Sequence, residues 1–423
     1  MYILGINISH DPSCCLLKDG EIVWYSEDDR LLGEKSIENP YTNLISHYEE
    51  HQEFEVADFP HCDNIKKHTH NIDYVVFASY GAHDPIDDNI IMQSIIKKLG
   101  EERVDFTASL FFPEKHHIYH AANAFYASGF DDAVALVMDG GGAYDPKYRE
   151  EVTSKKCEFP FREVETIYDC SYDTTEFKKV FQLNSMLDSL PGENGDLDNY
   201  QDFFWKRDWN DFSSRSASAG NLFAGACNIF DMNHNDQGKV MGLSGHRIPT
   251  SGYGSYVGDD GLIDDDETFS LNETFDPSKF FMTSDWFYEK DGISLAKPLI
   301  MTTADDFICS NDIDIDLKDN TYDFYVCAEI AYKLQMETFK HTCTLIEKAI
   351  NLTGKKKIVL SGGYFLNCVN NYKYTKKFPE LEFFVDPIPH DAGTAIGAAK
   401  YVWYGLTKSK DKIPLKNLYT GSM

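Results

Sequence analysis

Two histidines four residues apart open an alanine-rich segment of this 423-residue chain. A helix would place His116 and His120 on one face, where the two imidazoles can share a metal ion. Asp139 follows an apolar strand and precedes three glycines, and Asp391 lies in the segment PHDAGT at a predicted helix start. The alternatives are helix-end packing for the histidines and turn or capping roles for the aspartates. Two imidazoles with two carboxylates suit Fe(II), Mn(II) or Zn(II).

Glycine pairs and triplets follow several predicted strands, at 140–142, at 238 and 242, and at 362–363. Such turns expose backbone N–H groups that can bind phosphate. Lys239, in a predicted tight turn over residues 238–243, is a candidate charge partner for a phosphate. A single Gly-Gly turn more often has a structural role, but with three sets nucleotide binding and a structural role become equal alternatives. The candidate nucleotide residues are Gly140, Gly141, Lys239, Gly362 and Gly363.

His10 and Asp11 directly follow the first predicted strand. A histidine there could accept the proton of a substrate hydroxyl, because its ordinary pKa lies near neutrality. From the residues alone, a histidine at this position more commonly serves as a hydrogen-bonded turn residue than as a base.

The elements that would position these residues alternate between strands and helices. The first thirty residues read as three strands with a hairpin turn at Asp19-Gly20. Residues 71–78 and 132–138 read as buried strands, and two strand-like runs near 157–161 and 163–170 could complete a second meander. Later elements are predicted as helix 322–351, strand 357–360, a helix from about 365, strand 381–385 and helix 393–404. This β-α-β-α order predicts an α/β fold.

Composition narrows the class of protein. The formal net charge is −30, which disfavours nucleic-acid binding except through a local basic groove. No apolar run reaches the roughly 18–20 residues that span a bilayer, and the first residues do not resemble a secretion signal. The ten cysteines are scattered and read as reduced thiols. These features favour a cytoplasmic enzyme or regulated binding protein with no membrane partner.

Five segments, in order along the chain, resemble the NodU-type O-carbamoyltransferases, which share the acetate-kinase/actin-like ATPase fold. They are ILGINISHDPSCCLLKDGEIV, KHHIYHAANAFYASGFDDAVALVMDGGG, GKVMGL, LSGGYFLNCVNN and PHDAGTAIGAA. The resemblance implies an α/β, two-lobed ATPase fold with mixed sheets flanked by helices. It implies lobes at 1–128 and 129–405, with insertions at 143–215 and 246–320. The last helix, 393–404, is expected to pack back on the N-terminal lobe.

The same resemblance implies carbamoyl transfer from carbamoyl phosphate, through a carbamoyl-adenylate made with ATP and Mg, to an acceptor hydroxyl. By motif, His116, His120, Asp139 and Asp391 match the ligands of a metal that is usually iron. His10, beside Asp11, matches the histidine that lies next to the acceptor hydroxyl in members of the family. Residues matching the nucleotide site are Lys239, Gly362, Gly363 and Asn367, with Asn371 in the same motif.

Members of the family usually carry a C-terminal YrdC-like domain that makes the carbamoyl-adenylate. Residues 406–423 read as a tail or as the join to such a domain. The alternatives are a YrdC-like domain that follows in the same protein, a separate YrdC-like subunit, or a reduced function. The acceptor would be a small molecule or a modified nucleotide, and a homodimer is left open. A threonylcarbamoyl transferase acting on tRNA and a catalytically silent nucleotide-binding partner are the alternatives.

Overall fold

The computed structural model describes the residues that carry most of the predicted sites. They are 1–33, 42–79, 85–143, 161–172, 176–186, 214–216, 218–230, 232–233, 236–246, 287–290, 293–296, 298–300 and 320–418. Most of the predicted insertions, at 143–215 and 246–320, therefore lie outside the described residues.

Backbone packing divides the chain into two units. Unit 1 comprises Met1–Gln182, Leu352–Phe365 and Phe383–Met423, and unit 2 comprises Leu183–Asn351 and Leu366–Glu382. Apolar residues of both main sheets share one core within unit 1. The predicted lobes at 1–128 and 129–405 stay a prediction.

The first sheet of unit 1 has the strand order β3-β2-β1-β4-β5. Its strands are β1 (Tyr2–Asn7), β2 (Ser13–Lys18), β3 (Glu21–Glu27), β4 (Asn71–Ala78) and β5 (Asp105–Phe111). The first three strands pair antiparallel, and β4 pairs parallel with β1 and β5. Asp19 and Gly20 both have positive φ, as a two-residue hairpin turn requires. The predicted opening meander is confirmed.

The second sheet of unit 1 runs in the order β8-β7-β6-β13-β14. Its strands are β6 (Asp132–Met138), β7 (Phe161–Ser171), β8 (Lys178–Met186), β13 (Lys357–Ser361) and β14 (Glu382–Val385). β6 pairs antiparallel with β7 and parallel with β13. The sheets are therefore mixed, and with the helices they confirm the predicted α/β class. The second meander is formed by β6, β7 and β8. The strand predicted near 163–170 is confirmed as β7, and most of the run predicted near 157–161 lies outside the described residues.

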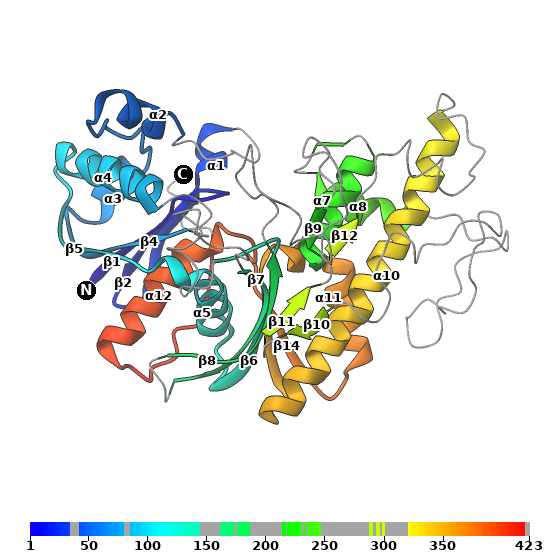
Figure 1. Cartoon of the computed structure of the whole chain (residues 1–423). Helices are drawn as coiled ribbons and strands as arrows, with labels where there is room; N and C mark the ends of the chain where they lie inside the picture. The colour runs from blue at the N-terminus through cyan, green and yellow to red at the C-terminus, as the bar shows by residue number, and fades with distance from the viewer. Residues whose placement is uncertain are drawn as a thin grey trace. The chain divides into compact units, whose positions relative to one another are not determined.

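Two helices fill the space between these sheets (Figure 1). α5 (His116–Ser128) packs against α12 (Gly393–Thr407), and α12 also packs against β1, β2 and β4. Small residues allow this approach: a Cβ on Gly397 would lie 1.9 Å from the carbonyl oxygen of Tyr119. The buried core joins apolar residues of both sheets to the two helices, including Ile3, Val76, Phe125, Val137 and Val359.

Three helices cover the other face of the first sheet. They are α2 (Thr42–His51), α3 (Cys62–His68) and α4 (Pro85–Glu101). A second apolar core, which includes Leu4, Phe77 and Ile91, lies beneath them. The short elements of unit 1 are α1 (Asp28–Leu32), η1 (Pro113–Lys115) and part of η5 (Gly363–Leu366).

The segment after α12 stays on unit 1. Lys412 lies 2.8 Å from Asp131 and Lys416 lies 2.9 Å from Glu21, and the N–H of Leu415 donates to the carbonyl of Ala127. Residues 408–418 of the predicted tail are thus anchored along unit 1.

The described part of unit 2 consists mainly of helices. These are α7 (Ala219–Ile229), α8 (Gln237–Leu243), η3 (Ser244–His246), α10 (Asn320–Thr353) and α11 (Cys368–Lys377). Its short strands are β9 (Ser214–Ser216), β10 (Phe287–Lys290), β11 (Ile293–Ala296) and β12 (Pro298–Ile300). β9 pairs with β12, β10 pairs with β11, and β11 also pairs with Leu183 and Asn184 at the end of β8.

One predicted element has the wrong structure. Residues 238–243 form part of helix α8, where the sequence predicted a tight turn. Gly238 and Gly242 have no neighbouring atom that a Cβ would meet, so neither glycine serves a close approach. The intervening side chains favour a helix, and Val240 is buried on its inner face.

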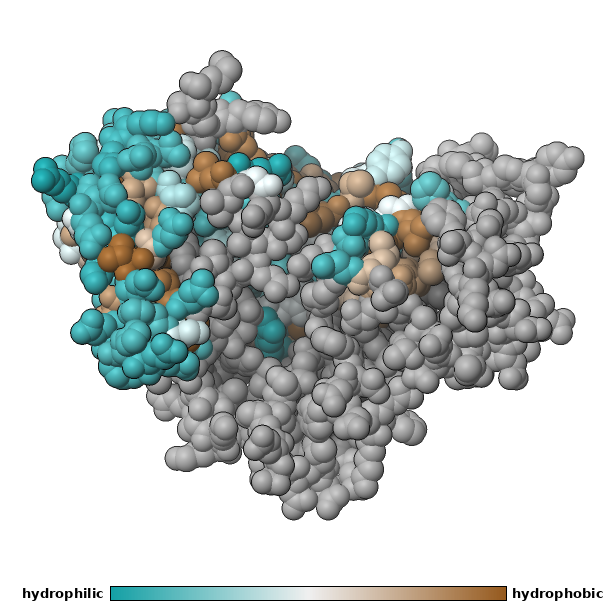
Figure 2. All heavy atoms as spheres, turned by 90° about the horizontal axis from the view of Figure 1, so that it is seen from above, coloured by the Kyte–Doolittle hydropathy of each residue, from teal (hydrophilic) through white to brown (hydrophobic). Residues whose placement is uncertain are grey.

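The described surface agrees with the composition. In the space-filling view its atoms are mostly hydrophilic, with smaller hydrophobic areas between them (Figure 2). None of the helices in the described part of the chain is long and apolar enough to cross a membrane.

Candidate metal centre

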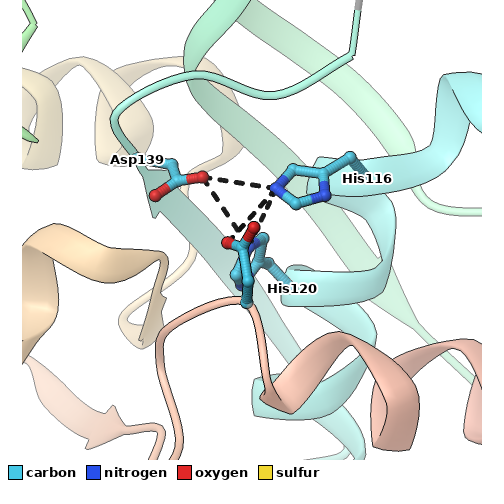
Figure 3. A group of neighbouring side chains, drawn as sticks. His116, His120 and Asp139 are labelled. Carbon is cyan, nitrogen blue, oxygen red and sulfur yellow. Dashed lines mark hydrogen bonds and ion pairs between the residues drawn. The ribbon is translucent and has the colours of Figure 1, made fainter. Parts of the chain in front are cut away.

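Four predicted residues from three separate segments converge in unit 1. They are His116, His120, Asp139 and Asp391, and one potential ligand atom of each lies within 4.8 Å of the others. Both histidines project from the first turns of α5 toward Asp139, which follows strand β6 (Figure 3). Asp391 immediately precedes α12.

The spacing of these atoms suits one shared cation. The two histidine Nε2 atoms are 3.2 Å apart, and Asp139 Oδ2 lies 3.2 Å from that of His116 and 3.9 Å from that of His120. Asp391 Oδ1 lies 3.6 Å and 3.4 Å from the same two atoms. Nitrogen and oxygen ligands bound about 2.1 Å from one ion stand roughly 3–3.5 Å apart. The donor set therefore fits a metal that binds imidazole and carboxylate.

The cluster also concentrates charge in a buried place. Burial favours the neutral form of Asp139, but the hydrogen bond with His116 and the charge of His120 hold the pKa of Asp139 below its usual value. Burial lowers the pKa of His116, and Asp391 and Asp139 outweigh it, so that this pKa is raised. Two buried carboxylates facing two imidazoles need a positive charge, which a cation would supply.

A buried glutamate fixes two of the segments that carry the cluster. Oε1 of Glu163, on β7, accepts the backbone N–H of His117 at 3.3 Å and that of Ala143 at 3.1 Å. Nδ1 of His117 lies 2.7 Å from the Thr166 hydroxyl, and burial holds the pKa of His117 well below its usual value. Glu163 thus ties the start of α5 to the loop after Asp139.

The predicted catalytic pair lies in the turn between β1 and β2. Nδ1 of His10 is 2.9 Å from Oδ2 of Asp11, and Nδ1 of His390 is 3.3 Å from the same oxygen. Asn7 donates to the carbonyls of His10 and Asp11, where Asp11 has a φ of 53°. The hydrogen bond with Asp11 raises the pKa of His10 to about 9 against the effect of burial, and Asp391 and Asp139 contribute. The four-residue cluster is therefore close enough to influence His10.

One predicted nucleotide residue of unit 1, Gly363, contacts the same cluster, and the others lie in neighbouring loops. The N–H of Gly363 donates to Asp139 Oδ1 at 3.2 Å, and the N–H of Gly362 donates to the carbonyl of Pro389. The carbonyl of Gly141 accepts a hydrogen bond from Arg162 at 2.7 Å. Gly140 follows Asp139 directly in the loop after β6. These contacts give the glycines structural roles, and nucleotide binding stays a prediction.

The other predicted nucleotide residues belong to unit 2. Lys239 is exposed and lies 2.7 Å from Asp236. Asn367 caps α11 by accepting the N–H of Asn370, and its amide pairs with that of Gln335. Asn371 is buried in α11. Nucleotide contacts at these three positions stay predictions.

The structure adds residues that sequence reasoning missed. His390, Glu163, Asn123 and Asp386 all contact the segments that carry the cluster. Asn123 and His390 had local signals, because Asn123 follows His120 by three residues on the same helix face and His390 directly precedes Asp391. The others meet the site only through tertiary structure.

The α/β fold of unit 1 thus brings two buried histidines and two buried aspartates from three segments into one group whose donor atoms suit a metal ion. The profile of the family described as "Carbamoyltransferase N-terminus" matches residues 2–400, so the chain belongs to that family.

Two curated relatives were found. The uncharacterized protein sll1178 of Synechocystis sp. is 23% identical over 441 residues, covering 100% of this chain and 60% of that protein. Nodulation protein NolNO of Sinorhizobium fredii is 37% identical over 70 residues, covering 16% of this chain and 10% of that protein. The chain thus spans 60% or less of the length of these relatives.

Solved structures with a distant likeness were also found. The activator of 2-hydroxyisocaproyl-CoA dehydratase from Clostridium difficile is 12% identical with a TM-score of 0.42, covering 99% of this chain and 100% of that one. Full-length HypF is 13% identical with a TM-score of 0.41, covering 96% of this chain and 56% of that one.

Proposed function

We propose that the chain is the transfer half of an ATP-dependent O-carbamoyltransferase with one metal ion. The observation that carries the proposal is the convergence of His116, His120, Asp139 and Asp391 within a chain of the carbamoyltransferase N-terminus family. The nearby pair of His10 and Asp11 supplies a group suited to proton transfer.

His116, His120, Asp139 and Asp391 would hold Fe(II), with Mn(II) or Zn(II) as the other ions that suit such ligands. When bound, the ion supplies Lewis-acid polarisation of the phosphate in a mixed carbamoyl-phosphate anhydride. The Asp139 and Asp391 charges, which contribute to the raised pKa of His10, would be offset by a cation held at these ligands.

The residues of the chain support the transfer step as follows. Asp11 orients the His10 ring through Nδ1, which leaves Nε2 to accept the proton of the acceptor hydroxyl. The acceptor oxygen bonds to the carbamoyl carbon, the bond from that carbon to the phosphate oxygen breaks, and AMP leaves with the electron pair. Asp11 stabilises the imidazolium that results, as a carboxylate does in other acid–base pairs.

The donor is proposed to be carbamoyl-adenylate, made from carbamoyl phosphate and ATP with Mg by a YrdC-like activity in the same protein or on a separate subunit. The acceptor is proposed to be a hydroxyl on a small molecule or a modified nucleotide. The acidic composition weighs against tRNA as acceptor, since binding the phosphate backbone of a nucleic acid needs a cationic protein surface.

The test supplies the donor in two forms. The purified, metal-loaded chain is given synthetic carbamoyl-adenylate and a panel of hydroxyl acceptors, and in parallel carbamoyl phosphate with ATP and Mg. We expect carbamoylated product, detected by mass spectrometry, only with carbamoyl-adenylate. ATP binding without transfer from either donor would contradict the proposal and favour a silent nucleotide-binding partner.

A further inference from the structure

Asp391 reaches the cluster on a short loop that has its own anchor. The loop begins after β14 at Asp386 and ends where α12 begins at Gly393. Its backbone is fixed at two points, since the N–H of Gly362 donates to the Pro389 carbonyl at 2.7 Å and the Ser13 hydroxyl donates to the Ala392 carbonyl at 2.7 Å. The position of the Asp391 carboxylate therefore depends on how this loop is held.

Asp386 is the central contact of that anchor. Its carboxylate is 2% exposed and accepts hydrogen bonds from three different elements. Asn123 Nδ2 of α5 lies 2.7 Å from Oδ2, the Ser361 hydroxyl of β13 lies 3.0 Å from Oδ2, and the Ile388 N–H of the loop lies 2.9 Å from Oδ1. A buried carboxyl group so placed resists displacement, because losing any donor leaves a buried oxygen atom without a hydrogen-bond partner.

Asn123 connects this anchor to the histidines. It follows His120 by three residues and His116 by seven, so all three side chains share one face of α5. Its Nδ2 also lies 3.3 Å from the Ile388 carbonyl. A Cβ on Gly393 would lie 2.5 Å from the same nitrogen, so glycine is needed where helix and loop meet.

We propose that Asn123 and Asp386 are positioning residues for the metal centre. They lock the loop that carries Asp391 to the helix face that carries His116 and His120. The inference rests on the proposed metal site but not on the transfer reaction. Substituting a residue that holds the metal ligands in place typically weakens metal binding by about 10- to 100-fold.

The test measures Co(II) binding to the full, metal-depleted chain by visible absorption and by competition with a chelator. We expect Asn123→Leu and Asp386→Asn each to weaken Co(II) binding by about 10- to 100-fold and to change the absorption bands. The double variant should bind Co(II) no more weakly than the weaker-binding single variant. The reason is that both single variants and the double variant lose the same hydrogen bond, the one between Asn123 and Asp386. Multiplied effects in the double variant would overturn the proposal.

Two further variants guard against a general loss of stability. Ser361→Ala removes one donor and should weaken Co(II) binding less than either main substitution, which keeps the proposal testable if a main variant fails to fold. Asn370→Leu removes a buried amide of unit 2 and should lower stability without changing Co(II) affinity.

The outcomes separate this proposal from the proposed function. A wild-type chain that binds no Co(II) would overturn both. Wild-type binding together with Asn123→Leu and Asp386→Asn affinities within twofold of wild type and unchanged spectra would overturn the positioning role alone. Weakened binding in a chain that transfers no carbamoyl group would support the positioning role and contradict only the proposed function.

Discussion

The Nε2 atoms of His116 and His120 lie 3.2 Å apart, one helical turn from each other on α5. Asp139 and Asp391 complete the group from two other segments. Four such groups reach this spacing only because α5 and α12 pack closely between two sheets. The packing of α5 against α12 thus brings together the four side chains of the candidate metal site.

Removing a ligand should remove the metal. In His116→Ala or Asp139→Ala, three ligands remain, and metal affinity should fall by more than the roughly 10- to 100-fold typical of a lost outer partner. Elemental analysis after equilibration with Fe(II) or Zn(II) measures the metal content of each chain. His61→Gln is the matched control, because His61 is also a buried histidine paired with an aspartate, Asp28. Equal metal content in wild type and both ligand variants would show that these residues hold no metal.

The protonation of His10 should depend on Asp11. The hydrogen bond with Asp11 raises the pKa of His10 to about 9. Asp11→Asn should therefore lower this pKa toward the ordinary value of 6.5, as measured by NMR titration of the imidazole in the metal-free chain. Since a base must be neutral, transfer should increase with pH as His10 loses its proton. An unchanged pKa in the variant would contradict the role given to Asp11.

The same pair gives a signed stability prediction. Because the folded-state pKa of His10 is raised, the stabilisation from the pair is fully present below pH 6.5 and is lost as pH rises through about 9. Denaturant unfolding across this range should show a smaller decline in Asp11→Asn than in wild type. A decline of equal size would show that other groups cause it.

Two glycines of α12 should respond in opposite directions to the same substitution. Gly397→Ala forces a methyl against the Tyr119 carbonyl and should lower the free energy of unfolding by about 1–3 kcal/mol. Gly405 has no neighbouring atom within reach of a Cβ, so Gly405→Ala should raise it by about 0.5–1 kcal/mol. Urea denaturation measures both. A neutral Gly397→Ala would mean that α5 and α12 do not pack as closely as described.

Local patterns predicted the elements with strong signals of their own. The Asp19-Gly20 hairpin and the alanine-rich helix at His116 needed no tertiary context. The edge strand β5 was missed, because only one face of Asp105–Phe111 packs inward and its apolar signal is weak. Helix α8 was mistaken for a turn, because its glycines outweighed the helix-forming residues between them.

The residues of the candidate site also fall into those with a local sequence signal and those that depend on tertiary structure. Residue type and spacing on α5 indicated the two histidines, the end of a strand indicated Asp139, and the start of a helix indicated Asp391. Asp386 and Glu163 could not be predicted, because they act through hydrogen bonds across elements far apart in sequence. The nucleotide predictions at Asn367 and Asn371 depended on family motifs, whereas Lys239 was also indicated by the glycines around it. Lys239 pairs with Asp236 and the Asn367 amide pairs with Gln335, and nucleotide contacts at all three positions stay predictions.

The transfer assay with synthetic carbamoyl-adenylate tests the central claim most directly when it compares three samples. These are the metal-loaded chain, the same chain after metal removal, and metal-loaded His10→Ala, with metal content measured in each. The account predicts carbamoylated acceptor and AMP from the first sample alone, with His10→Ala keeping its metal. Equal product from all three samples, or none from the metal-loaded wild-type chain, would contradict it.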